Sequence, residues 1–300
     1  SSVVGLVVVS AVTITATIAF FSDTEKSGGN TFAAGDINLT VGNESYYNGS
    51  YNQATSWLSD ELAVEKFFDY EDLKPGDWGE DTISMLVGSN EAYACANIAI
   101  TQNDDNGVVD PEDEMDGSFD SLDGTITGDL AEEINFVVWL DDGDNVLESD
   151  ESVLLQDNLA IALDGGYTFT FADSNENVVG ADGGLDPNIN HYIGKAWCYG
   201  DLGLNPVTQD GYGDQISPEG SIDNSGITCD GELVSNLSQT DKIAANISFY
   251  AEQVQNNPDF ICSDSLFPAV DEEFVTYEME DKNSSDWSII VDDRYGVLRY

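Results

Sequence analysis

The sequence predicts an all-β protein, a jelly roll or antiparallel β-sandwich with long decorated loops. Short strand-like runs recur along the chain, breaks rich in Gly, Asn and Asp separate them, and long helical patterns are scarce. A chain of 300 residues can bury a substantial core, in one large β domain or two small ones. We expect an N-terminal apolar donor strand (1–21), a jelly-roll domain with insertions (22–262) and a C-terminal extension (263–300).

Several segments show the strand pattern of alternating or β-branched apolar residues. In chain order they are 31–41, 81–88, 93–100, 134–140, 151–156, 167–171, 191–200, 242–251 and 273–279. The stretches 102–130 and 199–235 have little periodicity and are predicted to be long loops.

One segment, 56–68, has the spacing of a short helix. Ser56 would cap its first turn, and Leu58, Leu62 and Phe67 would lie roughly on one side. We therefore expect a single short helix after the first strand of the domain.

The N-terminal stretch from Val3 to Phe21 is apolar, in a chain that is otherwise strongly acidic. Its second half alternates with a period of two and is rich in β-branched residues, which favours a strand. Because 21–30 reads as a linker rather than a hairpin turn, this strand can pair with another subunit and complete its sheet. The candidate donor residues are Val3, Val4, Leu6, Val8, Val12, Ile14, Ala16, Ile18 and Phe20.

Other structures of the N-terminal stretch stay open. A run of this length is also typical of a signal-peptide core or a membrane helix. A pilin-like helix bundle is a further alternative, which the three threonines and Gly5 disfavour.

The charge is extreme, with 58 acidic and 8 basic residues and a formal net charge of −50. A general nucleic-acid binder is excluded because phosphate binding requires a basic face, and attraction to anionic lipid is disfavoured. Such an excess of acid indicates a surface adapted to high salt, carboxylates that bind divalent cations, or both.

The four cysteines are widely separated and contain no CxxC pair, which argues against zinc. In a secreted protein they most simply form two disulfides, for which three connectivities exist. We predict Cys198 with Cys229 and Cys95 with Cys262. The first pair would close a Gly-, Asp- and Asn-rich excursion, where constraining the unfolded chain helps most.

Six N-x-S/T sequons are candidate glycosylation sites, and they begin at Asn38, Asn43, Asn48, Asn236, Asn246 and Asn283. A sequence this rich in Asn and Ser contains several sequons by chance. Asn246 has added support, since the apolar residues of 242–251 alternate with it and leave it on the opposite face of the strand.

Two acidic turns are candidate calcium sites, because hard oxygen ligands at alternate positions of a turn suit this cation. The first, in 139–151, offers Asp142, Asp144, Glu148 and Glu151. The second, in 103–117, offers Asp104, Asn106, Asp110 and Asp113. Neither matches the full EF-hand pattern, and a solvated acidic turn is the alternative for both. No cofactor is required by the sequence, and Ca²⁺ is the one that it suggests.

Three stretches occur together: FFSDTEKSGGNTFAAGDINLTV at 20–41, DLKPGDWGEDTISMLV at 72–87 and QTDKIAANISFYAEQVQNNPDF at 239–260. In this order they resemble the camelysin/TasA family of secreted bacterial and archaeal matrix proteins. The resemblance implies a jelly-roll domain that polymerises into extracellular fibres, in which an N-terminal segment of one subunit completes the sheet of the next. Family signal peptides usually end close to FSDTE. In this chain, either the signal-peptide cleavage site lies upstream of FSDTE, or part of the ancestral hydrophobic segment is used as the donor strand.

Camelysin is classed as a metallopeptidase, but the residues of this chain do not favour an enzyme. It has a single histidine, His191, and no HExxH, which removes the usual zinc-protease ligands. It also has no GxSxG and no phosphate-cradling glycine loop. We expect His191 to be structural and the protein to have no catalytic residues.

The sequence therefore predicts a structural subunit of an extracellular filament, pilus-like or a matrix fibre, secreted through a signal peptide to the cell surface. Its partners would be copies of itself, with neighbouring filaments and cell-surface glycans as further contacts and no nucleic acid. The alternatives are a membrane-anchored surface protein with 3–21 as a helix and a secreted metal-dependent peptidase.

Overall fold

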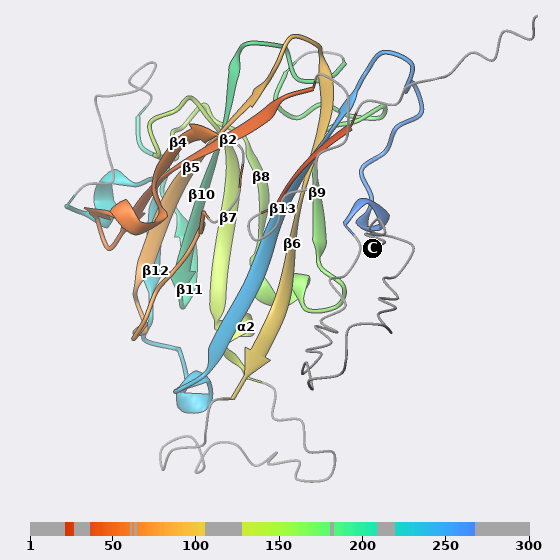
Figure 1. Ribbon diagram of the computed structural model, residues 1–300. Helices are drawn as coiled ribbons and strands as arrows, with labels where there is room; N and C mark the ends of the chain where they lie inside the picture. The colour runs from red at the N-terminus through yellow and green to blue at the C-terminus, as the bar shows by residue number, and fades with distance from the viewer. Residues whose placement is uncertain are drawn as a thin grey trace, which may run out of the picture. The chain divides into compact units, whose positions relative to one another are not determined.

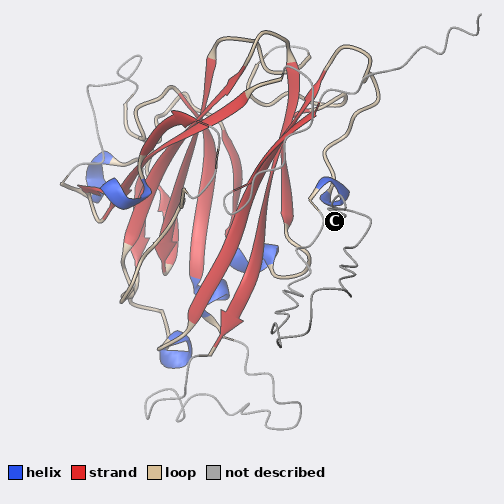
Figure 2. Cartoon of the chain, in the orientation of Figure 1, coloured by secondary structure: helices blue, strands red, loops and turns tan. Residues whose placement is uncertain are grey.

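The protein is a β-sandwich, as seen in a computed structural model that describes residues 22–26, 37–60, 62, 65–105, 128–180, 183–208 and 220–267. Figures 1 and 2 show the antiparallel sheets and only short helical pieces. The all-β class predicted from the sequence is confirmed. The compact unit extends to residue 268, a little past the expected boundary at 262. The strand expected at 273–279 lies outside the described residues.

The smaller sheet has the strand order β1-β13-β6-β9, with every pairing antiparallel. Its strands are β1 (Ser22–Lys26), β6 (Ala92–Asp104), β9 (Tyr167–Ala172) and β13 (Lys242–Gln253). The sequence placed Ser22–Lys26 in a linker, and this was wrong. The segment pairs with β13 from Glu252 to Ser248, because the edge of β13 offers it backbone partners.

The larger sheet has seven strands in the order β3-β2-β5-β10-β7-β8, with β4 also paired to β2. Their bounds are β2 (Leu39–Tyr47), β3 (Ser50–Tyr51), β4 (Trp57–Asp60), β5 (Trp78–Val87), β7 (Ile134–Asp141), β8 (Val153–Asn158) and β10 (Asn190–Tyr199). A separate hairpin joins β11 (Asp201–Leu204) to β12 (Ile227–Asp230). The helical pieces are α2 (Leu130–Glu133) and the 3₁₀ turns η1 (Gln53–Thr55), η2 (Leu159–Ala162), η3 (Ile222–Asn224), η4 (Asn236–Ser238) and η5 (Asp264–Leu266).

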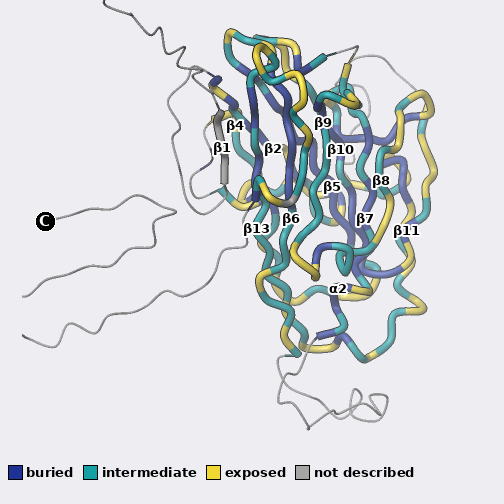
Figure 3. Tube along the Cα trace, turned by 90° about the vertical axis from the view of Figure 1, so that its right-hand side faces the viewer, coloured by how far each residue is buried: buried dark blue, intermediate teal, exposed yellow. Residues whose placement is uncertain are grey.

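The main core lies between the two sheets, where alternate residues of facing strands pack together. Met85 of β5, Ile193 of β10 and Phe249 of β13 are almost fully buried there. The ring of Phe249 lies 5.7 Å from that of Phe67 and 6.3 Å from that of Phe171, measured between centroids. In Figure 3 the buried stretches follow the strands, and the exposed ones lie mainly in the connecting turns.

The outer face of the larger sheet is also covered, and this corrects the expectation of a loop over 199–235. The β11–β12 hairpin packs on that face and forms a second core with Trp78, Trp139 and Leu147. A disulfide between Cys198 of β10 and Cys229 of β12 fastens the hairpin to the sheet. Apolar burial and one covalent bond therefore convert a segment of weak periodicity into an ordered layer.

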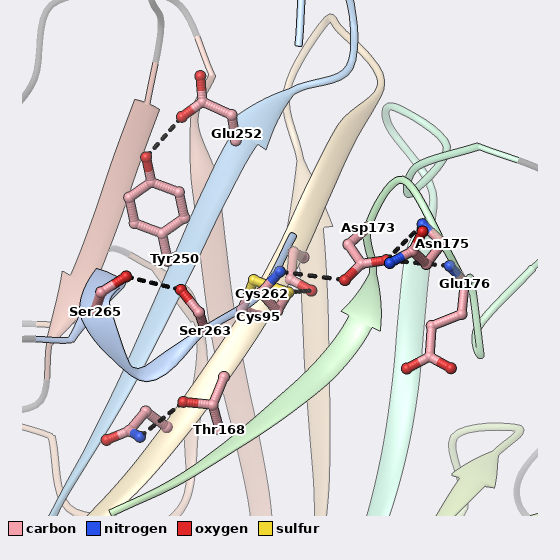
Figure 4. Close-up of a disulfide and its surroundings, with 12 residues drawn as sticks. Cys95, Thr168, Asp173, Asn175, Glu176, Tyr250, Glu252, Cys262, Ser263 and Ser265 are labelled. Carbon is pink, nitrogen blue, oxygen red and sulfur yellow. Dashed lines mark hydrogen bonds between the residues drawn. A yellow bond between two sulfur atoms is a disulfide. The ribbon is translucent and has the colours of Figure 1, made fainter. Parts of the chain in front are cut away.

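The outer face of the smaller sheet is covered by residues 254–267. The ring of Phe260 stacks between those of Tyr93 and Tyr250, with centroid distances of 5.5 and 5.8 Å. Cys262 forms a disulfide with Cys95 of β6, and its backbone N–H donates to Asp173 Oδ2 at 3.2 Å (Figure 4). Both disulfides thus join the cysteines that the sequence analysis paired.

The helix expected over 56–68 is wrong. Trp57–Asp60 forms β4, paired with β2, and Leu58 is 91% exposed rather than part of an apolar face. The indole of Trp57 donates to the Val41 carbonyl at 3.2 Å and packs against Phe67. A strand edge and a tertiary aromatic contact together outweigh the weak helical spacing.

Replacing Cys198 and Cys229 together by alanine should lower the free energy of unfolding by about 4 kcal/mol, because the bond constrains a separation of 31 residues in the unfolded chain. The same change at Cys95 and Cys262, which are 167 residues apart, should lower it by roughly 5 kcal/mol. Denaturant unfolding followed by tryptophan fluorescence measures both. A larger loss from the shorter loop would contradict the chain-entropy explanation.

Candidate functional site: an apolar groove and an acidic loop

An apolar groove of about 730 Å³ lies between the two sheets. Its walls include Phe136 and Val138 of β7, Ile193 of β10, and Ile247 and Phe249 of β13. Sandwich interiors are normally packed to crystal density, so an internal space of this size is an exception. The groove is large enough to receive apolar side chains from outside the described fold.

The groove separates the main core from a third apolar cluster at the other end of the sheets. That cluster contains Leu130, Phe136, Trp197 and Tyr199. Gly79 of β5 makes room for the Trp197 indole, since a Cβ at this position would lie 2.5 Å from Trp197 Nε1. Residues of both clusters line the groove.

The groove runs beside an open strand edge. β13 pairs with β6 over its whole length but with β1 only through Ser248–Glu252. Lys242–Ile247 therefore has no strand partner on that edge among the described residues. Ile243 and Ile247, from this stretch of β13, also line the groove. An incoming strand would find both backbone partners and an apolar surface here.

A buried ion pair borders the groove. Lys195, which lines it, binds Asp81, whose side chain is fully buried. Asn43 Nδ2 also donates to Asp81 Oδ1 at 3.2 Å. A buried carboxylate requires such partners, because desolvation of an unpaired charge is costly.

The first acidic turn folds over the outer face of the larger sheet, directly after β7. Leu147 anchors it: the side chain is fully buried, and the backbone N–H donates to the Ser225 carbonyl at 3.0 Å. Glu151 closes the loop, since Oε1 accepts the Asp142 N–H at 3.0 Å and Oε2 accepts the Glu148 N–H at 2.8 Å. We use "acidic loop" below for residues 141–151.

Carboxylates converge within the acidic loop. The side-chain oxygens of Asp142, Asp144 and Glu148 lie within 4.8 Å of one another, and Asp141, Asp142 and Glu151 form a second such group. Ligand oxygens around one calcium ion, at about 2.3–2.6 Å from it, are separated by similar distances. Both groups consist of hard oxygen donors without histidine or cysteine. The donor set therefore suits Ca²⁺ rather than zinc.

Burial raises the pKa of several of these groups. It raises the pKa of Asp144 to about 8, with further contributions from Asp141 and Asp142, and that of Glu151 to about 8 against the effect of its backbone hydrogen bonds. Burial likewise raises the pKa of Asp141 to about 6, although Thr82 and Trp139 donate to it. The loop carries closely spaced acids that hinder one another's ionisation.

Sequence reasoning missed Glu80, which lies beneath the acidic loop. Glu80 is fully buried on β5, and neither carboxylate oxygen has a hydrogen-bond partner among the described residues. Burial, followed by the charges of Asp141 and Asp81, raises its pKa well above the usual range. In the sequence, Glu80 shares a face of the 78–87 strand with Thr82 and Ser84, a polar pattern that gave no signal of its burial.

The predicted site residues have different outcomes. The loop carboxylates Asp142, Asp144 and Glu148 come together, with Glu151 beside them. Of the second turn, Asp104 ends β6 and is exposed. Asn106, Asp110 and Asp113 and all the donor residues from Val3 to Phe20 lie outside the described residues. His191 is half-buried near the start of β10, with Nε2 3.3 Å from the Asp186 carbonyl.

One sequon is contradicted by the structure. Asn43 is 4% exposed and its Nδ2 donates to the Thr55 carbonyl at 2.7 Å, so a glycan has no room there. Asn38, Asn48 and Asn236 are exposed. Asn246 is half-buried, and Asn283 lies outside the described residues.

The chain matches no protein-family model and no curated protein at a significant level. Among the described residues, the helices are all too short or too polar to cross a bilayer. The two disulfides are typical of a protein that folds outside the reducing cytosol.

Replacing Lys195 by methionine should lower the free energy of unfolding by about 3–5 kcal/mol, because Asp81 would remain as a buried carboxylate without its cation. Adding Asp81→Asn should restore much of this loss. Chemical denaturation of the single and double variants measures the difference.

Lys66→Met is the matched control, since the Lys66–Asp69 pair is exposed and should contribute about 0–1 kcal/mol. Equal losses from Lys195→Met and Lys66→Met would contradict the buried-pair interpretation.

Proposed function

We propose that the protein is a structural subunit of an extracellular filament, joined to the next subunit by exchange of an N-terminal strand. The observation that carries the proposal is that the edge of β13 without a strand partner among the described residues lies beside the apolar groove. Residues 3–21 of a neighbouring copy supply the occupant, since they offer apolar residues at the spacing of a strand.

The register of β1 supports exchange between copies. Ser22 lies opposite Glu252, and β13 ends at Gln253, so residue 21 is the last that this register can place opposite β13. The apolar stretch before it cannot pair along β13 of its own subunit in the same register. We infer that it pairs with a second molecule instead.

The energetics favour a durable junction. Burying about eight apolar side chains at roughly 1.5–3 kcal/mol each yields on the order of 10–20 kcal/mol before the entropic costs of association. Donor and acceptor are different surfaces of one chain, so the contact is heterologous and need not close. Repetition of such a contact produces a fibre.

Three further features fit this proposal. The stretches at 20–41, 72–87 and 239–260 resemble the camelysin/TasA family, whose members form secreted fibres by this mechanism. Two disulfides suit an extracellular location. The exposed sequon residues Asn38 and Asn48, neither of which lines the groove, leave room for glycans on the filament surface.

Replacing Ile14 and Ile18 by lysine should abolish filament formation, because both side chains belong to the apolar face of the donor strand. Thr13→Lys with Thr17→Lys is the matched control, with the same added charge on the opposite face, and should still assemble. Negative-stain electron microscopy and sedimentation measure assembly. Filaments from the isoleucine variant, or none from the threonine control, would contradict a face-specific donor strand.

The acceptor can be tested separately with Ile247→Lys, which places a charge in the groove. This variant and the donor-defective Ile14→Lys/Ile18→Lys variant should each fail to assemble alone. Mixed, they should form dimers and no filaments, since one retains a donor and the other an acceptor. Leu58→Lys, at a position that is 91% exposed, serves as the control that still polymerises.

The rival functions predict other results. If the protein were membrane-anchored, the unmodified chain would partition into detergent through residues 3–21 and would form no filaments visible by electron microscopy. A metal-dependent peptidase would cleave protein substrates and lose that activity with a chelator.

A further inference from the structure

We propose that one calcium ion binds between the acidic loop and the larger sheet, held by Asp142, Asp144 and Glu148 from the loop and by Glu80 from β5. This inference goes beyond the proposed filament function and does not depend on it. Glu80 is what distinguishes the place from an ordinary acidic turn.

The position of Glu80 follows from the strand register. Glu80 and Thr82 are alternate residues of β5 and therefore lie on the same face. Thr82 Oγ1 donates to Asp141 Oδ2 at 2.8 Å, which places this face against the start of the acidic loop. Glu80 lies opposite Ala196 of β10, a member of the second core, so it lies beneath the layer that covers the sheet.

No described side chain neutralises Glu80. Its two oxygens are buried without a hydrogen-bond partner. Ser225 lies near Glu80, but its one hydroxyl proton is donated to the Ile222 carbonyl at 2.6 Å. The three ion pairs between described residues involve other carboxylates. A buried carboxylate in this state is neutralised either by a proton or by a bound cation, since its desolvation is otherwise uncompensated.

The loop presents further oxygens toward such an ion. Asp144 Oδ2 is buried without a hydrogen bond, while Oδ1 accepts the Val146 N–H at 3.0 Å. Asn145 is 1% exposed, and its side-chain oxygen also has no hydrogen-bond partner among the described residues. Several carboxylates with one amide oxygen form the irregular, oxygen-rich shell that Ca²⁺ accepts more readily than Mg²⁺.

Binding would clamp the acidic loop onto the sheet. The loop contributes Leu147 to the second core, and Asp141 ends β7. An ion shared between the loop and β5 therefore joins the covering layer to the sheet at a second point, in addition to the Cys198–Cys229 disulfide.

The test uses the full 300-residue chain, unassembled, with Tb³⁺ and Ca²⁺ as probes. Trp139 Nε1 lies 3.3 Å from Asp141 Oδ1, so excitation of tryptophan should sensitise Tb³⁺ luminescence, and Ca²⁺ should displace the signal as a single saturable ion. Glu80→Gln and Asp144→Asn should each weaken Ca²⁺ binding by about tenfold or more, a loss typical of altered ligation. Mg²⁺ should bind more weakly than Ca²⁺.

Glu132→Gln is the matched control, because Glu132 is exposed in α2, which precedes β7, whereas the acidic loop follows it. It should leave Ca²⁺ affinity unchanged. Absence of saturable binding, binding of Mg²⁺ as tight as that of Ca²⁺, or unchanged affinity in either Glu80→Gln or Asp144→Asn would overturn the proposal. Should Glu80→Gln fail to fold, as judged by circular dichroism, Asp144→Asn decides the result alone.

Discussion

Burial of both faces of both sheets is the constraint on which the rest of this fold depends. The sheets share one core, and each also needs a cover on its outer side. Residues 254–267 cover the smaller sheet, and the β11–β12 hairpin with the acidic loop covers the larger one. One disulfide fastens each cover, Cys95–Cys262 and Cys198–Cys229. A covalent bond suits this task, since short covering segments bury too little apolar area to remain in place alone.

Because both faces of the larger sheet are covered, two acidic side chains of β5 are buried. Glu80 and Asp81 are consecutive and point to opposite faces, yet both are fully buried. On the inner face, Asp81 pairs with Lys195 and accepts from Asn43. On the outer face, Glu80 meets other carboxylates instead of a cation. Asp81 is therefore neutralised by a cation of the chain itself, whereas Glu80 has no such partner among the described residues.

Local patterns in the sequence were enough to predict the strands at 134–140, 191–200 and 242–251, because period-two alternation survives whatever packs above them. Non-local effects were not predictable in the same way. β11 and β12 are ordered by packing on the larger sheet. Trp57 is held by the ring of Phe67 and by the Val41 carbonyl, which lies 16 residues away in the sequence. Glu80 alternates with polar Thr82 and Ser84, a pattern typical of a solvent face, until a distant segment covers it.

The net charge of −50 raises two separate electrostatic problems. Surface carboxylates repel one another through water, and salt screens that repulsion, with a Debye length of about 3 Å at 1 M. The diffuse salt atmosphere does not screen Glu80, because its carboxylate is buried beneath a packed layer. Salt therefore relieves the surface but not the interior, where only a proton or a bound cation neutralises the group. The side-chain oxygens of Asp142, Asp144 and Glu148 converge within 4.8 Å of one another in the loop above Glu80, and this arrangement suits a bound cation.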